Sequence, residues 1–285
     1  MLKYTISKAA AAILLLSAMT ALSSCQGDLM KNDGISQKNR EALLQDSLKT
    51  VKTERIFFGH QSVGNNIIQG IREIAENAGT EAPDFIEGKK APVPGQNGFF
   101  HSGIGTNTKP LEKIQEFDSI LRSGMAGQLD IAFMKLCYVD INADTDTEGL
   151  FAYYRDTMTS LRKDFPAVRF VHFTAPLTAS NFKDGIKALL GRPSDSREGN
   201  IKREEYNAFI RQEYAGKEPV FDLAKFESPS LSGKQDQKAY KNQTYQRLRT
   251  EYTDDGGHLN KTGRGYISEA LVLFLASVTA QPEIK

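Results

Sequence analysis

Tryptophan is absent from the 285 residues of the chain, and cysteine occurs only twice, at Cys25 and Cys137. Two cysteines cannot supply the set of disulfides that stabilises many small secreted domains. Neither sign of charge dominates, because 36 Lys and Arg stand against 35 Asp and Glu. Nucleic-acid-binding proteins carry a clear basic excess, and so do polybasic membrane-docking segments. The balance therefore argues against both kinds of partner.

The apolar run near the N-terminus is too short for a membrane span. Residues 9–22 are largely apolar, whereas a spanning helix needs roughly 20 such residues. Lys3 and Lys8 precede the run, which is the pattern of a secretory signal peptide. The segment Leu22-Ser23-Ser24-Cys25 resembles the lipobox of bacterial lipoproteins, in which the cysteine is acylated and becomes the first residue. The alternative is an ordinary secretory signal followed by a chance cysteine.

The lipobox resemblance implies three parts of the chain. Residues 1–24 would be a signal peptide, residues 25–52 a lipidated Cys25 with a polar tether that includes a helix around 39–49, and residues 53–285 one folded domain. That domain is long enough for a sizeable core. A membrane anchor in the bacterial cell envelope is also implied, at the outer membrane or the cell surface. Without residues 1–24 the net charge becomes −1.

From residue 55 onward, short apolar runs alternate with segments of helical spacing. The runs predict strands at residues 55–59, 83–86, 129–134, 168–173 and 219–223. The spacing predicts helices at 63–78, 110–122, 147–165, 200–214 and 261–278, while 95–109 is predicted as a loop and 226–253 as a surface insertion. This alternation predicts an α/β fold with a parallel sheet covered on both faces. Sites in such sheets form beyond the carboxyl ends of the strands.

The first candidate for chemistry is Gly59-His60-Gln61-Ser62-Val63-Gly64, between a predicted strand and its helix. A helix N-terminus favours negative charge, which suits a Ser62 nucleophile whose attack creates an oxyanion. The simpler alternative is that Ser62 only caps the helix.

The second candidate is Asp254-Asp255-Gly256-Gly257-His258-Leu259-Asn260, which precedes the last predicted helix. A hydroxyl nucleophile needs an adjacent base, and the base needs an orienting carboxylate. His258 and Asp255 could supply both from a single turn. The alternative is a glycine-rich turn with a helix cap.

Together the two segments resemble the SGNH, or GDSL-type, hydrolase family. In that family the nucleophilic Ser follows the first strand in a Gly-Asp-Ser motif, and Asp-x-x-His precedes the last helix. The resemblance covers residues 55–276. It implies a three-layer α/β/α sandwich with a flavodoxin-like parallel sheet of five strands, and ester hydrolysis without a cofactor. Ser62 would be the nucleophile, His258 the base and Asp255 its orienting group.

The family's oxyanion hole combines the nucleophile's amide, a Gly amide after the second strand and an Asn side chain after the third. Gly103 is the favoured counterpart of the Gly, and Gly105 is nearly as good. His60 could line the site, and Gln61 replaces the Asp of Gly-Asp-Ser.

The family's Asn has no counterpart after the third predicted strand. The chain there reads Lys135-Leu136-Cys137-Tyr138-Val139-Asp140. Asp140 is the only short polar side chain, and its carboxylate would repel an oxyanion unless it were protonated. Tyr138 or Lys135 could donate a hydrogen bond instead, whereas Cys137 is predicted as a buried small apolar residue.

The other histidines allow one further interpretation. His60, His101 and a carboxylate could bind zinc, but no histidine pair has the close spacing of a typical site, and no metal is predicted. His172 lies inside a predicted strand and is interpreted as a core residue.

The favoured function is hydrolysis of acyl esters, O-acetyl groups on a polysaccharide being the expected substrate of an exported enzyme. One alternative, motivated by Gln61 and the missing Asn, is a glycan-binding or assembly lipoprotein with little or no catalysis. Another is acyl transfer to a sugar by the same three residues.

Overall fold

The computed structural model describes residues 37–180, 195–230, 233–240 and 243–280. Six parallel strands form one sheet in the order β2-β3-β1-β4-β5-β6. They span β1 (Arg55–His60), β2 (Phe85–Glu87), β3 (Gly98–Gly103), β4 (Ile131–Met134), β5 (Arg169–Phe173) and β6 (Val220–Phe221).

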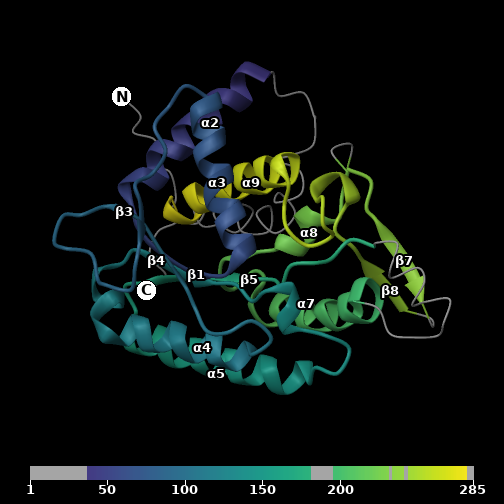
Figure 1. The fold of residues 1–285 in the computed structure, drawn as a ribbon. Coiled ribbons are helices and arrows are strands. Elements are labelled where there is room, and N and C mark those ends of the chain that lie inside the picture. Colours follow the sequence, from purple (N-terminus) through teal and green to yellow (C-terminus); the bar gives the residue numbers. More distant parts are fainter. Residues whose placement is uncertain (1–36, 181–194, 231–232, 241–242, 281–285) are drawn as a thin grey trace, which may run out of the picture.

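Helices cover both faces of this sheet (Figure 1). One face carries α2 (Gln37–Thr53), α3 (Ser62–Asn77), α8 (Leu223–Glu227) and α9 (Lys261–Thr279), and the other carries α4 (Pro110–Ile120), α5 (Thr147–Asp164) and α7 (Asn200–Tyr214). Short helical turns lie at Leu121–Met125, Ala126–Gln128, Tyr138–Asp140, Asp195–Gly199 and Thr250–Tyr252. The predicted three-layer α/β/α architecture is confirmed.

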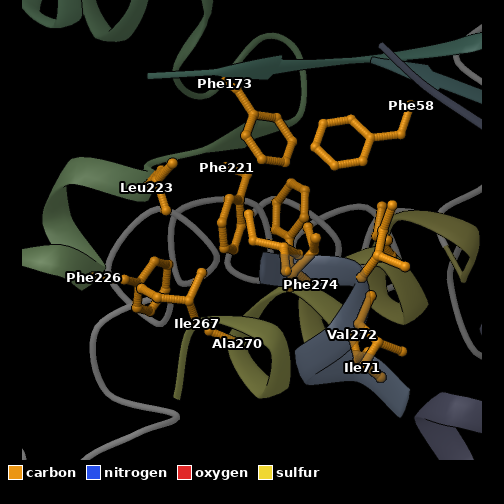
Figure 2. Packing of buried hydrophobic residues seen from close by; sticks show 14 of the residues in the cluster. Phe58, Ile71, Phe173, Phe221, Leu223, Phe226, Ile267, Ala270, Val272 and Phe274 are labelled. Atoms are coloured by element: carbon orange, nitrogen blue, oxygen red, sulfur yellow. The ribbon is translucent and has the colours of Figure 1, made fainter. Parts of the chain in front are cut away.

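Aromatic residues on the sheet form the centre of the core under α3 and α9. The rings of Phe58 and Phe133 lie 4.8 Å apart, and those of Phe133 and Phe173 stack at 4.9 Å. Figure 2 shows the rings of Phe58, Phe173 and Phe221, all from the sheet, gathered around Phe274 of α9. Because neighbouring residues of a strand face opposite sides, Phe57 packs into the second core under α4 and α5.

The sheet has six strands rather than the predicted five, because β3 lies inside the segment 95–109 that was predicted as a loop. Gly98, His101, Ser102 and Gly103 dilute the apolar signal of Phe99 and Phe100. The strand forms because it pairs with β1 on one side and β2 on the other, and its two Phe side chains fill opposite cores. His101 therefore lies in a strand and not in a loop.

The structure also differs from the predictions made for residues 219–223 and 226–253. Strand β6 is only two residues long, since Asp222 caps α8 and ends the strand predicted at 219–223. Within 226–253, the antiparallel hairpin of β7 (Gln237–Tyr240) and β8 (Gln243–Gln246) has mostly exposed side chains.

Helix α2 lies, except for Thr53, within residues 25–52, the predicted tether, yet it packs against α9. Leu44, Leu48 and Val51 are buried in the same cluster as the core of α3 and α9. At least the helical part of this segment therefore belongs to the folded domain. The predicted signal peptide and Cys25 lie outside the described residues. Among the helices that the structure describes, none is both long and apolar enough to cross a bilayer.

Candidate active site

The carboxyl ends of the strands bring together the two segments that the sequence singled out. Strand β1 ends at His60, and Ser62 is the first residue of α3. Gln61 alone separates the strand from the helix. His258 lies in the loop before α9, where the side chain of Asn260 caps the helix by accepting from the amide of Gly263. Helices α3 and α9 pack side by side, and Ser268 Oγ donates to the carbonyl of Ile67 at 2.8 Å.

Ser62, His258 and Asp255 form a continuous hydrogen-bonded row. The Oγ atom of Ser62 lies 2.9 Å from Nε2 of His258, and Nδ1 of the same ring lies 2.6 Å from Oδ2 of Asp255. A carboxylate can only accept, so Nδ1 carries the proton and Nε2 presents a lone pair to the hydroxyl. This is the arrangement that general-base activation of a hydroxyl requires.

The carboxylate of Asp255 is held as an anion. Its Oδ1 atom accepts from the amides of Gly257 at 2.9 Å and His258 at 2.8 Å. Desolvation acts to raise the pKa of Asp255, but the hydrogen bonds from the His258 ring and these amides outweigh it and hold the pKa below its ordinary value. The row is also open, since 56% of the Asp255 side chain and 40% of the His258 side chain are exposed.

Gln61 ties the turn before Ser62 to the chain that follows β3. Its Nε2 atom donates to the carbonyls of Ile104 at 2.8 Å and Gly105 at 2.9 Å. Its side chain does not cap α3. Gln61 is therefore a structural bridge between two loops of the site.

The two glycines that could donate to an oxyanion, Gly103 and Gly105, differ in their neighbours. The amide of Gly105 donates to Oε2 of Glu116 at 2.5 Å, and the residue has a φ of +54° in a tight turn. Gly103 is exposed at the end of β3, and a Cβ atom built on it would lie 3.8 Å from the Gln61 amide nitrogen. Gly103 is therefore the better placed of the two.

Asp140, near the expected Asn position, is not a bare carboxylate. Its oxygens accept from the buried ammonium of Lys113 at 2.6 Å and from the amides of Thr108 at 2.9 Å and Cys137 at 2.6 Å. Because this charge is compensated inside the protein, the expected repulsion of an oxyanion does not arise from it. Cys137 itself is buried, in agreement with the sequence-based interpretation.

The two substitute donors differ in position. Lys135 is completely buried, which lowers its pKa, and its Nζ donates to the carbonyl of Leu136 at 3.3 Å. The ring of Tyr138 is nearly perpendicular to that of His258 in an edge-to-face contact, with centroids 5.7 Å apart. A Cβ atom on Gly257 would lie 2.5 Å from Cζ of Tyr138, so a larger residue there would displace the tyrosine ring. Tyr138, and not Lys135, therefore lines the row of Ser62 and His258.

The remaining histidines are buried. His60 Nε2 lies 3.2 Å from His101 Nδ1. His172 is a core residue, as interpreted, with Tyr154 and Glu218 on its two ring nitrogens and Tyr214 stacked on it at 3.5 Å. In the described part of the chain, no three His, Cys, Asp or Glu side chains are grouped so that they could hold a metal ion.

Asn66 is a site residue that was not predicted from the sequence. Its Oδ1 atom accepts from the amide of Leu259 at 3.2 Å, which fixes the loop of His258 to α3. A signal was available, since Asn66 follows Ser62 by four residues and so lies on the same face of the helix.

No protein-family model matches the chain, and no curated protein matches its sequence. Solved structures of similar fold include a peptidoglycan O-acetylesterase, with 13% identity over 84% of this chain and 95% of that chain and a TM-score of 0.48. They include the periplasmic domain of a lipopolysaccharide acetyltransferase from Salmonella ser. Paratyphi A, with 13% identity, coverages of 89% and 95% and a TM-score of 0.43. A candidate GDSL-like lipase from Parabacteroides merdae has 11% identity, coverages of 80% and 97% and a TM-score of 0.38. At these identities the similarity concerns the fold alone.

Proposed function

We propose that the chain is a serine esterase that acts through an acyl-enzyme on Ser62. The observation that carries the proposal is the 2.9 Å contact between Ser62 Oγ and His258 Nε2, continued by the 2.6 Å contact from His258 Nδ1 to Asp255. A non-catalytic protein on the same fold has no need of this alignment. The geometry therefore favours an enzyme over the glycan-binding alternative.

The reaction would proceed in two steps, acylation of Ser62 and hydrolysis of the acyl-enzyme. Ser62 Oγ attacks the acyl carbon while its proton passes to His258 Nε2, and the tetrahedral oxyanion accepts hydrogen bonds from the amides of Ser62 and Gly103. Collapse breaks the ester bond, and His258 returns the proton to the departing alkoxide. Water then attacks the acyl-enzyme, again with His258 as base, and releases the acid and free Ser62.

A fluorophosphonate probe tests the nucleophile directly. The intact chain should be labelled on Ser62, and Ser62→Ala should take up no probe while its thermal unfolding stays close to that of the unmodified chain. Labelling of both proteins to the same extent, or of neither, would refute the proposal.

We infer further that the substrate is an acyl ester, such as O-acetyl, on a bulky carbohydrate. The exposure of His258 and Asp255 supports this, because an open site admits an ester that protrudes from a polymer.

Acetate release from acetylated xylan or pectin, compared with hydrolysis of long-chain esters, tests this inference. We expect release from the acetylated polymer to dominate. Activity confined to long-chain esters would contradict it, and transfer of acetyl groups to an added sugar without acetate release would favour the acyltransferase alternative.

Anchoring through a lipid on Cys25 is a separate proposal that rests on the lipobox sequence. Expression of the full chain in bacteria with radiolabelled palmitate should label the unmodified protein and leave Cys25→Ala unlabelled. Export of the unmodified chain without lipid would instead support an ordinary secretory signal.

A further inference from the structure

Two buried histidines lie directly behind the nucleophile turn, on neighbouring strands. His60 is the last residue of β1 and is 2% exposed, and His101 in β3 is 8% exposed. The Nε2 atom of His60 lies 3.2 Å from Nδ1 of His101, and Nδ1 of His60 lies 2.9 Å from the carbonyl oxygen of Gln61. The proposed esterase mechanism assigns no role to either ring.

Hydrogen-bond chemistry fixes the protons of this pair. The carbonyl of Gln61 can only accept, so Nδ1 of His60 carries a hydrogen. In the neutral ring, Nε2 then has a lone pair and must accept from Nδ1–H of His101. Burial lowers the pKa of both rings, that of His60 to about 3, so the neutral forms prevail near pH 7. The charged groups that act on the two rings are Lys135, Arg72 and Glu87.

One end of the pair is built into the turn that carries Ser62. The carbonyl of Gln61, which accepts from His60, also accepts from the amide of Gly64 at 2.8 Å in the first turn of α3. A Cβ atom on Gly64 would lie 2.3 Å from Cγ of His60. The ring therefore occupies the space that only glycine leaves free, and it fixes the backbone immediately before the nucleophile.

The other end of the pair lies in the strand of the proposed oxyanion donor. His101 precedes Gly103 by two residues in β3, and the register pairs His60 with Gly103. A hydrogen bond between the rings thus links the backbone before Ser62 to the strand that ends in Gly103. Neither ring nitrogen of His60 is available as a base for Ser62, because one donates to Gln61 and the other accepts from His101.

We propose that His60 and His101 are positioning residues that hold the nucleophile turn and the Gly103 strand in a fixed relation through a directional pair of imidazoles. This inference rests on the proposed esterase function. The fixed relation matters because a misplacement of about 1 Å between reacting groups can cost roughly 10²-fold in rate.

A matched pair of variants at His101 separates the hydrogen bond from mere packing. In His101→Asn, the side-chain NH₂ replaces Nδ1–H as a donor, whereas His101→Leu has similar bulk and no donor. We expect His101→Leu to lower kcat for an acetyl ester about 10- to 100-fold with KM within about twofold. His101→Asn should stay within about threefold of the unmodified chain. Equal activity of all three proteins, or equal loss in both variants, would overturn the proposal.

Two further measurements keep the test decisive. If His101→Leu does not fold, His60→Asn serves instead, because its side chain keeps a donor for the carbonyl of Gln61 but lacks the Nε2 acceptor. This variant should show the same loss of kcat as expected for His101→Leu. An unchanged kcat would count against the pair. Imidazole ¹⁵N NMR should report both rings protonated at Nδ1 and neutral at pH 7.5. Any other tautomer overturns the pair even if no esterase activity is found, so its failure is distinct from failure of the proposed function.

Discussion

At the scale of single residues, the amide of Gln61 does what a carboxylate could not do in the same place. It donates to two carbonyl oxygens, those of Ile104 and Gly105, and so attaches the loop after β3 to the residue before Ser62. An aspartate in the same place, as in the Gly-Asp-Ser motif that this segment resembles, would have no donor when ionised. Gln61 is therefore matched to the partners present in this chain.

Gln61→Glu should damage the site although the two side chains have the same shape. The new carboxylate would face two carbonyl oxygens without a proton to share, and because Gln61 is half-buried the cost should lie at the low end of the roughly 1–3 kcal/mol typical of an unsatisfied buried group, at about 1 kcal/mol. We expect kcat for an acetyl ester to fall about 10-fold or more at pH 7, with a lower free energy of unfolding. Gln212→Glu, an exposed change of the same charge on α7, should alter neither quantity. Unchanged kcat in Gln61→Glu would contradict the bridging role.

The residues of the row were predictable because each lies in a short local pattern. Ser62 follows a strand and begins a helix, and Asp255 and His258 share one turn before another helix. Asn66 lies on the same helix face as Ser62, so its nearness to the site was readable from the sequence, but its partner, the amide of Leu259, was not. The two carbonyl partners of Gln61 could not be read from the sequence either, because they follow a strand that was itself predicted as a loop.

At the scale of elements, the separation of α3 and α9 sets the distance between Ser62 and His258. Ser62 begins α3, and His258 precedes α9 by three residues. The helices approach closely at Gly70, where an added Cβ atom would lie 2.2 Å from Ser268 Oγ and 2.5 Å from the carbonyl oxygen of Arg264. A side chain at Gly70 would push the two helices apart.

Gly70→Ala should therefore affect both stability and activity. Overpacking of this kind costs about 1–3 kcal/mol of unfolding free energy, and a displaced α9 should also lower kcat. Gly265→Ala on α9 is the matched control, because a Cβ atom there meets no heavy atom within 4 Å. The control should be neutral or gain up to about 1 kcal/mol from helix propensity. Denaturant unfolding and ester hydrolysis of both variants check the prediction, which fails if the two behave alike.

The long helices and the apolar strands β1, β4 and β5 were predicted well, whereas strand β3 was not. The helical spacing at 63–78, 147–165, 200–214 and 261–278 corresponds to α3, α5, α7 and α9 within about two residues. Strand β3 was missed because its two Phe residues are surrounded by Gly, His and Ser. The stability of such a strand comes from pairing with β1 and β2, which depends on residues far away in the sequence.

At the scale of the whole molecule, helix α2 changes where the folded domain begins. The segment is polar enough to be interpreted as a tether, yet Leu48 and Val51 are fully buried against the core of α9. The ion pair between Arg40 and Glu269 lies on the same contact, with a distance of 2.6 Å. The apolar side chains of α2 were too few to predict from the sequence that this helix packs against the domain.

Two leucines on α2 test whether the helix is part of the domain. Leu48→Ala should lower the free energy of unfolding by about 2–5 kcal/mol, the cost of emptying a buried leucine site. Leu43→Ala on the exposed side of the helix should change it by no more than about 0.5 kcal/mol, since Leu43 is 43% exposed. Equal, small effects of both changes would mean that α2 is detached from the domain in solution.

Glu227 in α8 makes the stability of the whole domain depend on pH. Its side chain is fully buried, and Oε2 accepts from the amide of Leu177 at 2.6 Å, while Oε1 has no hydrogen-bond partner among the described residues. Burial raises the pKa of Glu227 to about 8. The folded protein therefore binds this proton more tightly than the unfolded chain does, so the contribution to stability is complete below pH 4.5 and is lost as the pH rises through 8.

Glu227→Gln should remove this dependence, because the amide keeps an acceptor for Leu177 and never ionises. For the unmodified chain we expect this group alone to lower the free energy of unfolding by about 3–5 kcal/mol between pH 5 and pH 9. In Glu227→Gln that slope should be largely absent, so the variant should be the more stable protein at pH 9. Glu148→Gln, an exposed change on α5, should leave the slope in place. If Glu227→Gln retained the full slope, the carboxyl group of Glu227 would already be ionised in the folded protein at neutral pH, with buried Lys135 as its counter-charge.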